Sequence, residues 1–202
     1  MNIEIVYNEL QCHRRWQNII SFSIYGNDPK YIQGAIENAK IAHVLYKKWT
    51  IRIYYDSSVS LSAIYELRGL DVELVDMSSS LLPAMQWRFL PMDDQEVSHF
   101  IVRAADSRLN ARESAVVNEW VVSGKAFHTM RNHTMRNHPR HNLHFMRGMW
   151  GAKGGAIPDM QTEMKNFNSD GTHSNAWDKD QNFLDAVLPR FVNANNTLMS
   201  LI

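Results

Sequence analysis

The chain of 202 residues carries 21 Lys or Arg and 21 Asp or Glu residues, so its formal net charge at pH 7 is zero. A balanced charge produces no overall field toward nucleic acid or an anionic lipid surface, and we expect no nucleic-acid partner. The length suits a single domain, because one hydrophobic core serves chains of up to roughly 250 residues.

The single cysteine, Cys12, excludes an internal disulfide framework and is compatible with a reducing compartment. The first sixteen residues lack the basic start, the long apolar run and the cleavage site of a signal peptide. No uninterrupted apolar stretch approaches the roughly 20 residues that cross a bilayer. We therefore expect a cytoplasmic protein without a transmembrane segment.

The first expected element is a buried strand over Ile19–Tyr25, which is rich in β-branched and aromatic residues and runs into a Gly-Asn-Asp-Pro turn. A helix follows from Pro29, since Asp28 can cap it and proline fits the first helical position. Apolar residues at helical spacing from Ile32 to Tyr46 give this helix one buried face.

Further apolar runs predict three more strands and a second helix. The strands are expected at Ile51–Tyr55, Val72–Val75 and Phe100–Val102, and the helix at Leu61–Leu67. Strands that alternate with helices favour a parallel sheet, because the crossover helices cover its faces. Asp56, Asp76 and Asp106 follow these strands, where open α/β sheets bind ligands, although for Asp76 we prefer a turn role.

The clearest helix of the second half is expected at Ala111–Ser123. Asn110 and Glu113 have capping-box spacing before it, and Gly124 closes it. Weaker signals predict a strand at Phe127–Met130 and a last helix from about Asp180 to Phe191. The expected fold class is therefore α/β, with a Rossmann-like, mostly parallel central sheet flanked by helices and an irregular C-terminal half that completes the site.

Five of the nine histidines fall within seventeen residues, partly because His-Thr-Met-Arg-Asn occurs twice in tandem at 128–137. They are His128, His133, His138, His141 and His144. Such a cluster invites a zinc interpretation, but no cysteine accompanies it and neighbouring arginines would repel a dication. We prefer polar or phosphate-facing loop roles for these histidines.

A glycine-rich stretch at Gly148–Gly155 lacks the Gly-Lys-Ser/Thr ending of a P-loop and does not follow the first strand. Both facts argue against ATP hydrolysis and dinucleotide chemistry. Trp150 in this stretch could stack on a sugar or form a lid, or it could be a buried tryptophan packed where glycines permit close approach.

The segment after the fourth strand places Asp106 between Arg103 and Arg108. This arrangement would suit a diphosphate and its cation. It is equally compatible with an ordinary surface cluster of ion pairs.

Several segments together resemble a family of small glycosyltransferase-like proteins with a GT-A fold, which occur in bacteria and large DNA viruses and include a chlorovirus capsid-glycosylating enzyme domain. The segments are Ser21–Gly26, Trp87–Leu90, Arg103–Asn110, Phe127–His141, Gly148–Gly155 and Asp180–Leu184. The resemblance implies one GT-A-like domain over residues 1–202. Its parts are a nucleotide-binding half at 19–110, a sugar and acceptor half at 111–192, and a tail at 193–202 that could lead into further domains.

The resemblance implies transfer of a sugar from a nucleotide-diphosphate-sugar, with a UDP-sugar favoured, to a glycan or glycoprotein acceptor. It also implies Mn²⁺ or Mg²⁺, held by an Asp-x-Asp motif, because the leaving nucleoside diphosphate gains negative charge. By this analogy Asp106 is the second aspartate and the metal ligand. Ala104 stands at the position of the first, and Asn137 replaces a further family aspartate in the histidine segment.

The donor residues carried over by resemblance lie in the first loop and at the strand ends. They are Ser23, Tyr25, Gly26, Asp56, Arg88, Arg103, Asp106, His138, Trp150 and Gly151. The catalytic pair is expected to be Asp180 and Gln181, with Asp180 as general base in an inverting reaction or as a sugar-orienting group in a retaining one. The alternative for Asp180 is simple helix capping.

Two other functions remain open on the sequence. The loss of carboxylates at Ala104 and Asn137 is compatible with a catalytically weakened module that binds a nucleotide-sugar or a glycan. An unrelated phosphate-binding protein, such as a nucleotidyltransferase, fits the fold pattern but explains neither the glycine-tryptophan stretch nor the Asp-Gln start of the last helix.

Overall fold

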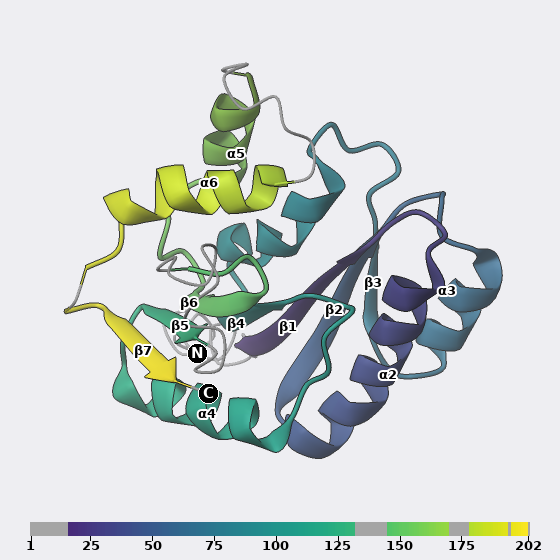
Figure 1. The fold of residues 1–202 in the computed structure, drawn as a ribbon, viewed down its shortest axis with the longest axis horizontal. Helices are drawn as coiled ribbons and strands as arrows, with labels where there is room; N and C mark the ends of the chain where they lie inside the picture. Colours follow the sequence, from purple (N-terminus) through teal and green to yellow (C-terminus); the bar gives the residue numbers. More distant parts are fainter. Residues whose placement is uncertain (1–15, 132–144, 170–177, 194, 202) are drawn as a thin grey trace, which may run out of the picture.

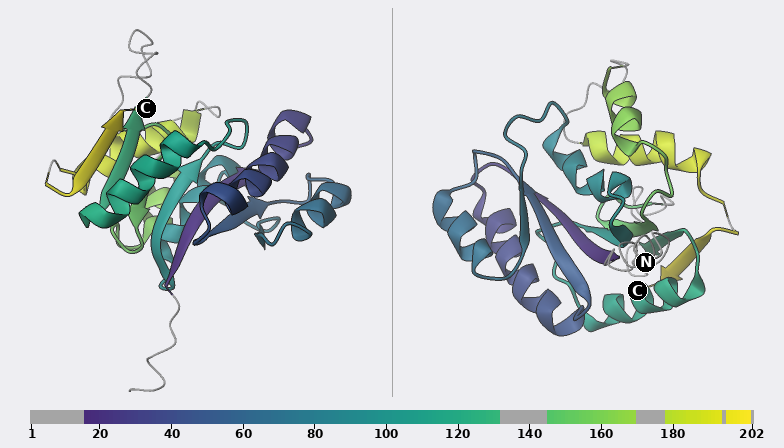
Figure 2. Two further views of the ribbon diagram at one scale, coloured as in Figure 1. Left: turned by 90° about the horizontal axis from the view of Figure 1, so that it is seen from below. Right: turned by 180° about the vertical axis from the view of Figure 1, so that it is seen from behind.

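A seven-stranded sheet with helices on both faces organises the computed structural model, which describes residues 16–131, 145–169, 178–193 and 195–201 (Figures 1 and 2). The strand order is β3-β2-β1-β4-β6-β5-β7. Four of the neighbouring pairs are parallel, and the two that involve β6 are antiparallel. The expected α/β class with a mostly parallel sheet is confirmed.

The first half of the chain forms strands and helices in alternation, as its apolar pattern predicts. The elements are β1 (Gln17–Ile24), α2 (Pro29–Leu45), β2 (Trp49–Tyr55), α3 (Leu61–Arg68) and β3 (Glu73–Asp76). Asp28 caps α2 by accepting a hydrogen bond from the backbone N–H of Lys30. The chain therefore moves outward from β1 to β3 on one side of the sheet.

The chain then returns to the other side of β1 through a long 3₁₀ segment. The elements are η1 (Ala84–Asp93), β4 (Val97–Arg103) and α4 (Ala111–Ser123). The predicted bounds and caps of α4 are confirmed, since Asn110 accepts from the Glu113 N–H and Gly124 adopts a left-handed conformation. Our sequence analysis expected no helical segment at η1, whose mixed composition and internal Pro91 give no α-helical pattern.

The described residues of the second half form three strands, two α-helices and one 3₁₀ helix. The elements are β5 (Phe127–Arg131), β6 (Met149–Lys153), α5 (Met160–Ser169), α6 (Lys179–Val187), η5 (Leu188–Arg190) and β7 (Thr197–Leu201). Two strands here were not predicted from the sequence: the glycine-rich stretch contains β6 between β4 and β5, and the segment at 193–202, expected to be a tail, contains β7 beside β5. The last α-helix also ends at Val187, before the expected Phe191, and continues as η5.

Side chains alternate between the two faces of each strand and so build two hydrophobic cores. Helices α2, α3 and α4 cover one face, where Ile101 of β4 packs near Trp120 of α4. The segments η1, α5 and α6 cover the other face, where Phe100 and Val102 pack near Trp150 of β6. Neighbouring residues at the end of β4 are thereby directed to opposite sides of the sheet.

Candidate functional site

A cavity of about 390 Å³ opens at the carboxyl ends of β1 and β4. Its lining comes from the loops after both strands, from α2, from η1 and from the start of α6. The lining residues are Ser23, Ile24, Tyr25, Gly26, Asn27, Asp28, Tyr31, Met85, Arg88, Ala104, Ala105, Asp106, Arg147 and Asp180. Six of the site residues expected from the sequence are among them: Ser23, Tyr25, Gly26, Arg88, Asp106 and Asp180.

A larger hollow of about 570 Å³ lies near the amino ends of β1 and β4, and its walls include Trp16, Asp93, Asp94 and Asp159. Among the described residues, its lining contains three aspartates and no lysine or arginine. A diphosphate would meet only negative charge there, so we place the candidate site at the carboxyl ends instead.

The loop after β1 is held by a short chain of hydrogen bonds. Gly26, at a φ of 73°, donates its N–H to Ser58 Oγ at 2.6 Å, and Ser58 Oγ in turn donates to Asp56 Oδ1. Asp56 therefore lies behind the cavity rather than in its lining. Its contact fixes the Gly26 turn, which a residue with a Cβ would adopt only under strain.

The loop after β4 carries Asp106 and is clamped by a buried side chain of α2. Asn38 donates to the carbonyls of Ala105 and Ser107 at 3.2 and 2.7 Å, and its Oδ1 accepts from the Leu109 N–H at 2.9 Å. A Cβ at Gly34 would lie only 2.1 Å from the Ala105 carbonyl oxygen, so glycine permits this close approach. Helix α2 thus fixes the position of Asp106.

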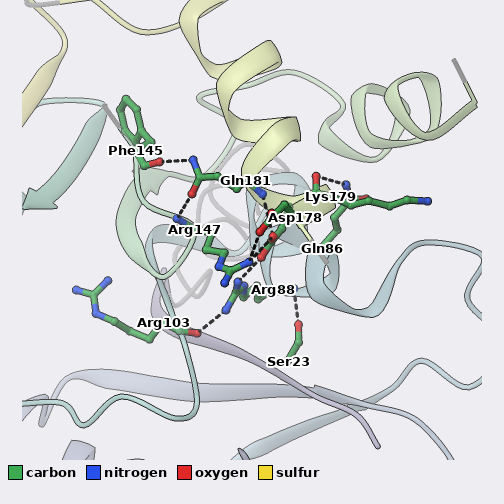
Figure 3. A network of polar contacts seen from close by, with 10 residues as sticks. Ser23, Gln86, Arg88, Arg103, Phe145, Arg147, Asp178, Lys179 and Gln181 are labelled. Atoms are coloured by element: carbon green, nitrogen blue, oxygen red, sulfur yellow. Dashed lines mark hydrogen bonds and ion pairs between the residues drawn. The ribbon is translucent and has the colours of Figure 1, made fainter. Parts of the chain in front are cut away.

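Arg88 and Asp180 form a buried ion pair in the cavity wall (Figure 3). Arg88 Nη2 donates to Asp180 Oδ2 at 2.6 Å, and Arg88 Nη1 donates to the carbonyl of Arg103 at 3.2 Å. The Arg88 backbone N–H donates to Ser23 Oγ at 3.0 Å. Through these contacts Arg88 joins η1 to β1, β4 and α6.

A second arginine approaches the same carboxylate from the segment before β6. Arg147 Nη1 lies 3.2 Å from Asp178 Oδ1 and 3.5 Å from Asp180 Oδ1. Gln181 accepts from the Arg147 N–H at 3.0 Å and donates to the Phe145 carbonyl at 2.8 Å. Gln181 therefore holds the Arg147 segment and does not line the cavity, so its expected catalytic role has no direct geometric support.

Two tyrosines give the cavity aromatic surface. Tyr25 and Tyr31 are each 40% exposed, and Tyr25 meets the Trp87 ring edge-on at a centroid distance of 6.2 Å. Burial raises the pKa of the Tyr25 hydroxyl, with Asp180 adding to the effect. The Tyr25 hydroxyl therefore remains a neutral donor at physiological pH.

Arg103 does not face the cavity, contrary to our expectation. Its side chain is 4% exposed and extends away from Arg88 (Figure 3). Its Nε lies 3.4 Å from Glu113 Oε2 of α4. Strand alternation explains the direction, because Arg103 shares the face of Ile101. Only its backbone carbonyl, the acceptor for Arg88, contributes to the candidate site.

Trp150 and Gly151 do not line the cavity and occupy packing positions, as the alternative of a buried tryptophan beside glycines predicts. Trp150 is fully buried between Phe89 and Phe100, with ring centroids at 5.5 and 5.6 Å. A Cβ at Gly151 would lie 2.7 Å from the Phe100 carbonyl oxygen and 3.2 Å from the Trp120 ring. The glycine serves close packing between strands and helix.

Of the five clustered histidines, for which we expected polar or phosphate-facing loop roles, only His128 lies among the described residues. His128 lies in β5, fully buried and stacked on Trp120 at a centroid distance of 5.4 Å, which is a core position. His138 and Asn137 lie outside the described residues, as do the other three histidines of the cluster. Their proposed roles stay predictions.

Lys30, Tyr31 and Arg147 were not predicted as site residues from the sequence. Lys30 Nζ lies 2.7 Å from Asp106 Oδ2, and the other two line the cavity. The signal for Lys30 and Tyr31 was present, because a helix that follows the first strand of a parallel sheet begins at the ligand-binding edge. Arg147 gave no comparable local signal.

The described carboxylates do not fit a protein-held divalent cation. No three His, Cys, Asp or Glu residues cluster suitably within the described ranges. Of the three acidic residues in the cavity lining, Asp28 caps α2, Asp180 accepts from Arg88, and Asp106 contacts Lys30. Hard cations need several oxygen ligands, and each of these carboxylates is already matched by a donor.

Comparison with solved structures finds the same fold in larger proteins. S. aureus TarS (residues 1–349) matches with a TM-score of 0.55 and 10% identity over 91% of this chain, which spans only 57% of that protein. Mannosyl-3-phosphoglycerate synthase from Rubrobacter xylanophilus matches with a TM-score of 0.55 and 10% identity, covering 96% of this chain and 67% of that one. No family model and no curated protein matches the sequence. At such identity the matches show the fold, which is the expected GT-A glycosyltransferase fold.

A glycosyltransferase involved in glycosylation of the major capsid of PBCV-1 is also similar, with a TM-score of 0.49 and 11% identity over 91% of this chain and 80% of that one.

Proposed function

We propose that this chain is a glycosyltransferase that moves a sugar from a nucleotide-diphosphate-sugar, with a UDP-sugar favoured, to a glycan or glycoprotein acceptor. One observation carries the proposal: the cavity lies between the loops that follow β1 and β4, where the chain switches from one side of β1 to the other. Open α/β sheets bind nucleotide ligands at such switch points. The GT-A fold of its structural neighbours gives independent support.

In the proposed donor-binding site, the aromatic part of the cavity binds the nucleoside and the basic part binds the diphosphate. The nucleoside would lie against Tyr25 near Gly26 and Ser23, since aromatic rings stack on bases. Arg88 and Arg147 would face the diphosphate. Arg88 Nε makes no hydrogen bond within the described residues although it is buried, and such a donor gains most from a ligand oxygen.

In the proposed reaction the bond between the anomeric carbon and the distal phosphate oxygen breaks, and its electron pair leaves with the nucleoside diphosphate. The acceptor hydroxyl oxygen bonds the anomeric carbon and loses its proton to a carboxylate or to water. Asp180 is the candidate carboxylate, at 1% exposure. Because Oδ2 accepts from Arg88 and Oδ1 from the Gln181 N–H, a sugar-orienting role fits Asp180 better than that of general base.

Both carboxylate oxygens of Asp180 already accept hydrogen bonds, and this also favours a second candidate function. A cavity whose carboxylates are all matched could bind a nucleotide-sugar or glycan without efficient transfer, particularly with Ala104 at the position of a family aspartate. This module would keep nucleotide affinity and lack turnover.

Isothermal titration of the purified chain with UDP, GDP and inorganic phosphate tests the proposed function. We expect UDP to bind at least tenfold more tightly than phosphate, and failure of both nucleotides to bind would contradict the proposal. Release of UDP from UDP-sugars, with and without glycan acceptors, then separates a transferase from the binding module. An Arg88→Met variant should weaken UDP binding, whereas Arg190→Met, which removes an exposed arginine paired with Glu163, should not.

No helix in the described part of the chain is long and apolar enough to cross a membrane. The cytoplasmic location expected from the sequence stays a prediction.

A further inference from the structure

We infer that Lys30, held beside Asp106, takes the place of a divalent cation in this cavity and makes nucleotide-diphosphate binding independent of metal. The inference rests on the proposed function. It concerns the chain's own residues, and it departs from the metal-assisted donor binding that the sequence resemblance implies.

The geometry puts an ammonium where an Asp-bound cation would be expected. Lys30 Nζ lies 2.7 Å from Asp106 Oδ2, and Asp106 lines the cavity. The backbones of both residues are held in place, since Lys30 is in the first turn of α2 and Asn38 of the same helix donates hydrogen bonds to the loop that carries Asp106. The pair is thus a defined feature of the cavity edge.

The Lys30 ammonium remains accessible to a ligand. Its side chain is 61% exposed and that of Asp106 is 26% exposed. An ammonium has three donors, and Asp106 uses one of them. Lysine is an established phosphate-binding residue that acts as a compact point charge, so the remaining donors suit a diphosphate oxygen.

The charge balance of the cavity argues against a dication at the same place. Among the described residues, Asp28, Asp106 and Asp180 are the acidic lining residues, and they are offset by Arg88 and Arg147 of the lining and by Lys30, which contacts Asp106 beside it. A metal ligated by Asp106 would have to share this carboxylate with the Lys30 ammonium, whose positive charge repels it. A diphosphate instead supplies the negative charge that three cations can bind without metal, and it gains more when the glycosidic bond breaks.

The matched control for Lys30 lies on the same helix. Lys40 is also exposed and paired with a carboxylate, Glu66, at 3.4 Å, but Glu66, unlike Asp106, does not line the cavity. Substitution of either lysine by glutamine removes one positive charge from α2. Only the loss of Lys30 should change nucleotide affinity.

The test is isothermal titration of UDP into the wild-type chain and into the variants Lys30→Gln, Lys40→Gln and Asp106→Asn, in EDTA and again with excess Mn²⁺. We expect wild-type affinity to change less than threefold with Mn²⁺. Lys30→Gln should weaken binding at least tenfold, and Lys40→Gln less than twofold. Asp106→Asn should retain or strengthen UDP binding, because it frees Lys30. If Asp106 were instead a metal ligand, the same substitution should abolish UDP binding.

A tenfold or larger gain in wild-type affinity with Mn²⁺, abolished in Asp106→Asn, would overturn the inference and leave the proposed function intact. Unchanged affinity in Lys30→Gln would overturn it too. If UDP and GDP bind to none of these proteins, the proposed function fails together with the inference. Circular dichroism and thermal unfolding of each variant show whether lost binding reflects lost folding.

Discussion

Two buried arginine–carboxylate pairs lie close together in this protein and serve different regions. Arg88 and Asp180 form a pair at 2.6 Å in the wall of the cavity. Arg103 and Glu113 form a pair at 3.4 Å under α4, in a region that also contains Tyr46 and His128. The carbonyl of Arg103 accepts from Arg88, so a single peptide group separates the two regions.

The difference shows the effect of strand alternation at the end of β4. The Arg103 side chain points into the core on one face, whereas its carbonyl meets Arg88 of the ligand-binding cavity. Arg103 ends β4 on the face that packs against α4, and burial raises the pKa of the neighbouring Tyr46 hydroxyl to about 12. Arg88 approaches the same strand end from the other face. We therefore expect damage to the Arg103 region to reduce stability and damage to the Arg88 region to reduce function.

The largest effect is expected for Glu113→Ala, which leaves Arg103 buried without its carboxylate. Loss of one partner of a buried pair should lower the free energy of unfolding by about 3–5 kcal/mol. The exposed pair of Arg108 and Glu37 supplies the control, since Glu37→Ala should cost about 0–1 kcal/mol. Urea denaturation measures both, and equal costs would contradict the distinction between the two regions.

The next effect concerns the cavity pair. Asp180→Asn keeps the size of the side chain and an acceptor for Arg88, so we expect a smaller loss of stability than in Glu113→Ala. Sugar transfer should fall about 100-fold, the usual cost of removing a positioned carboxylate. Glu66→Gln, which changes an exposed carboxylate of α3 paired with Lys40 away from the cavity, is the control. Unchanged transfer in Asp180→Asn would remove Asp180 from the proposed mechanism.

Asn38→Ala tests whether the cavity depends on a residue that does not line it. The change removes three hydrogen bonds to the loop at 105–109 and should destabilise the fold by about 2 kcal/mol. UDP affinity should fall several-fold because the residues of this loop, Ala105 and Asp106, form one wall of the cavity. Ser114→Ala, which loses one hydrogen bond to Leu45 away from the cavity, should cost about 1 kcal/mol and leave affinity unchanged.

The smallest effect, per pH unit, is a dependence of folding stability on pH, which arises from the buried region around Arg103. Burial lowers the pKa of His128 from 6.5 to about 3, and Arg103 contributes to the shift. Below pH 6.5 the unfolded chain binds a proton there that the folded chain does not, so stability falls as the pH drops toward 3. We expect a loss of about 1 kcal/mol per pH unit between pH 6 and 4.

Urea denaturation of wild type and His128→Gln across this range isolates the contribution. The variant should lose less stability on acidification, while His43→Gln, at an exposed position on α2, should follow the wild type. Parallel curves for wild type and His128→Gln would show that His128 is protonated in the folded protein.

Much of the fold could be predicted because its signals are local. Asp28 and Pro29 mark the start of α2, and the bounds of α4 follow from Asn110 and Gly124. The failures lie where context outweighs composition. Strand β6 is only five residues long and contains Gly151, yet it forms because β4 and β5 pair with it on both sides.

The candidate site was predicted in part for a similar reason. The residues that follow β1 and β4 line the cavity as expected, since strand ends define the ligand-binding edge. Arg103 and Trp150 were assigned to that edge and lie instead in the cores. Lys30 and Arg147 were missed, because one looked like an ordinary helix residue and the other reaches the cavity only through Gln181 and the acidic start of α6.

The sequence by itself determined the alternation of strands and helices, the helix caps and the edge of the sheet at which polar residues collect. These features depend on residues within a few positions of one another, where periodicity and capping hydrogen bonds act. Tertiary structure alone decided that Arg88 meets Asp180, which lies 92 positions later, and that Asp106 meets Lys30. Such pairs depend on strand order and on the face to which each side chain points, and both are set by how the whole sheet packs.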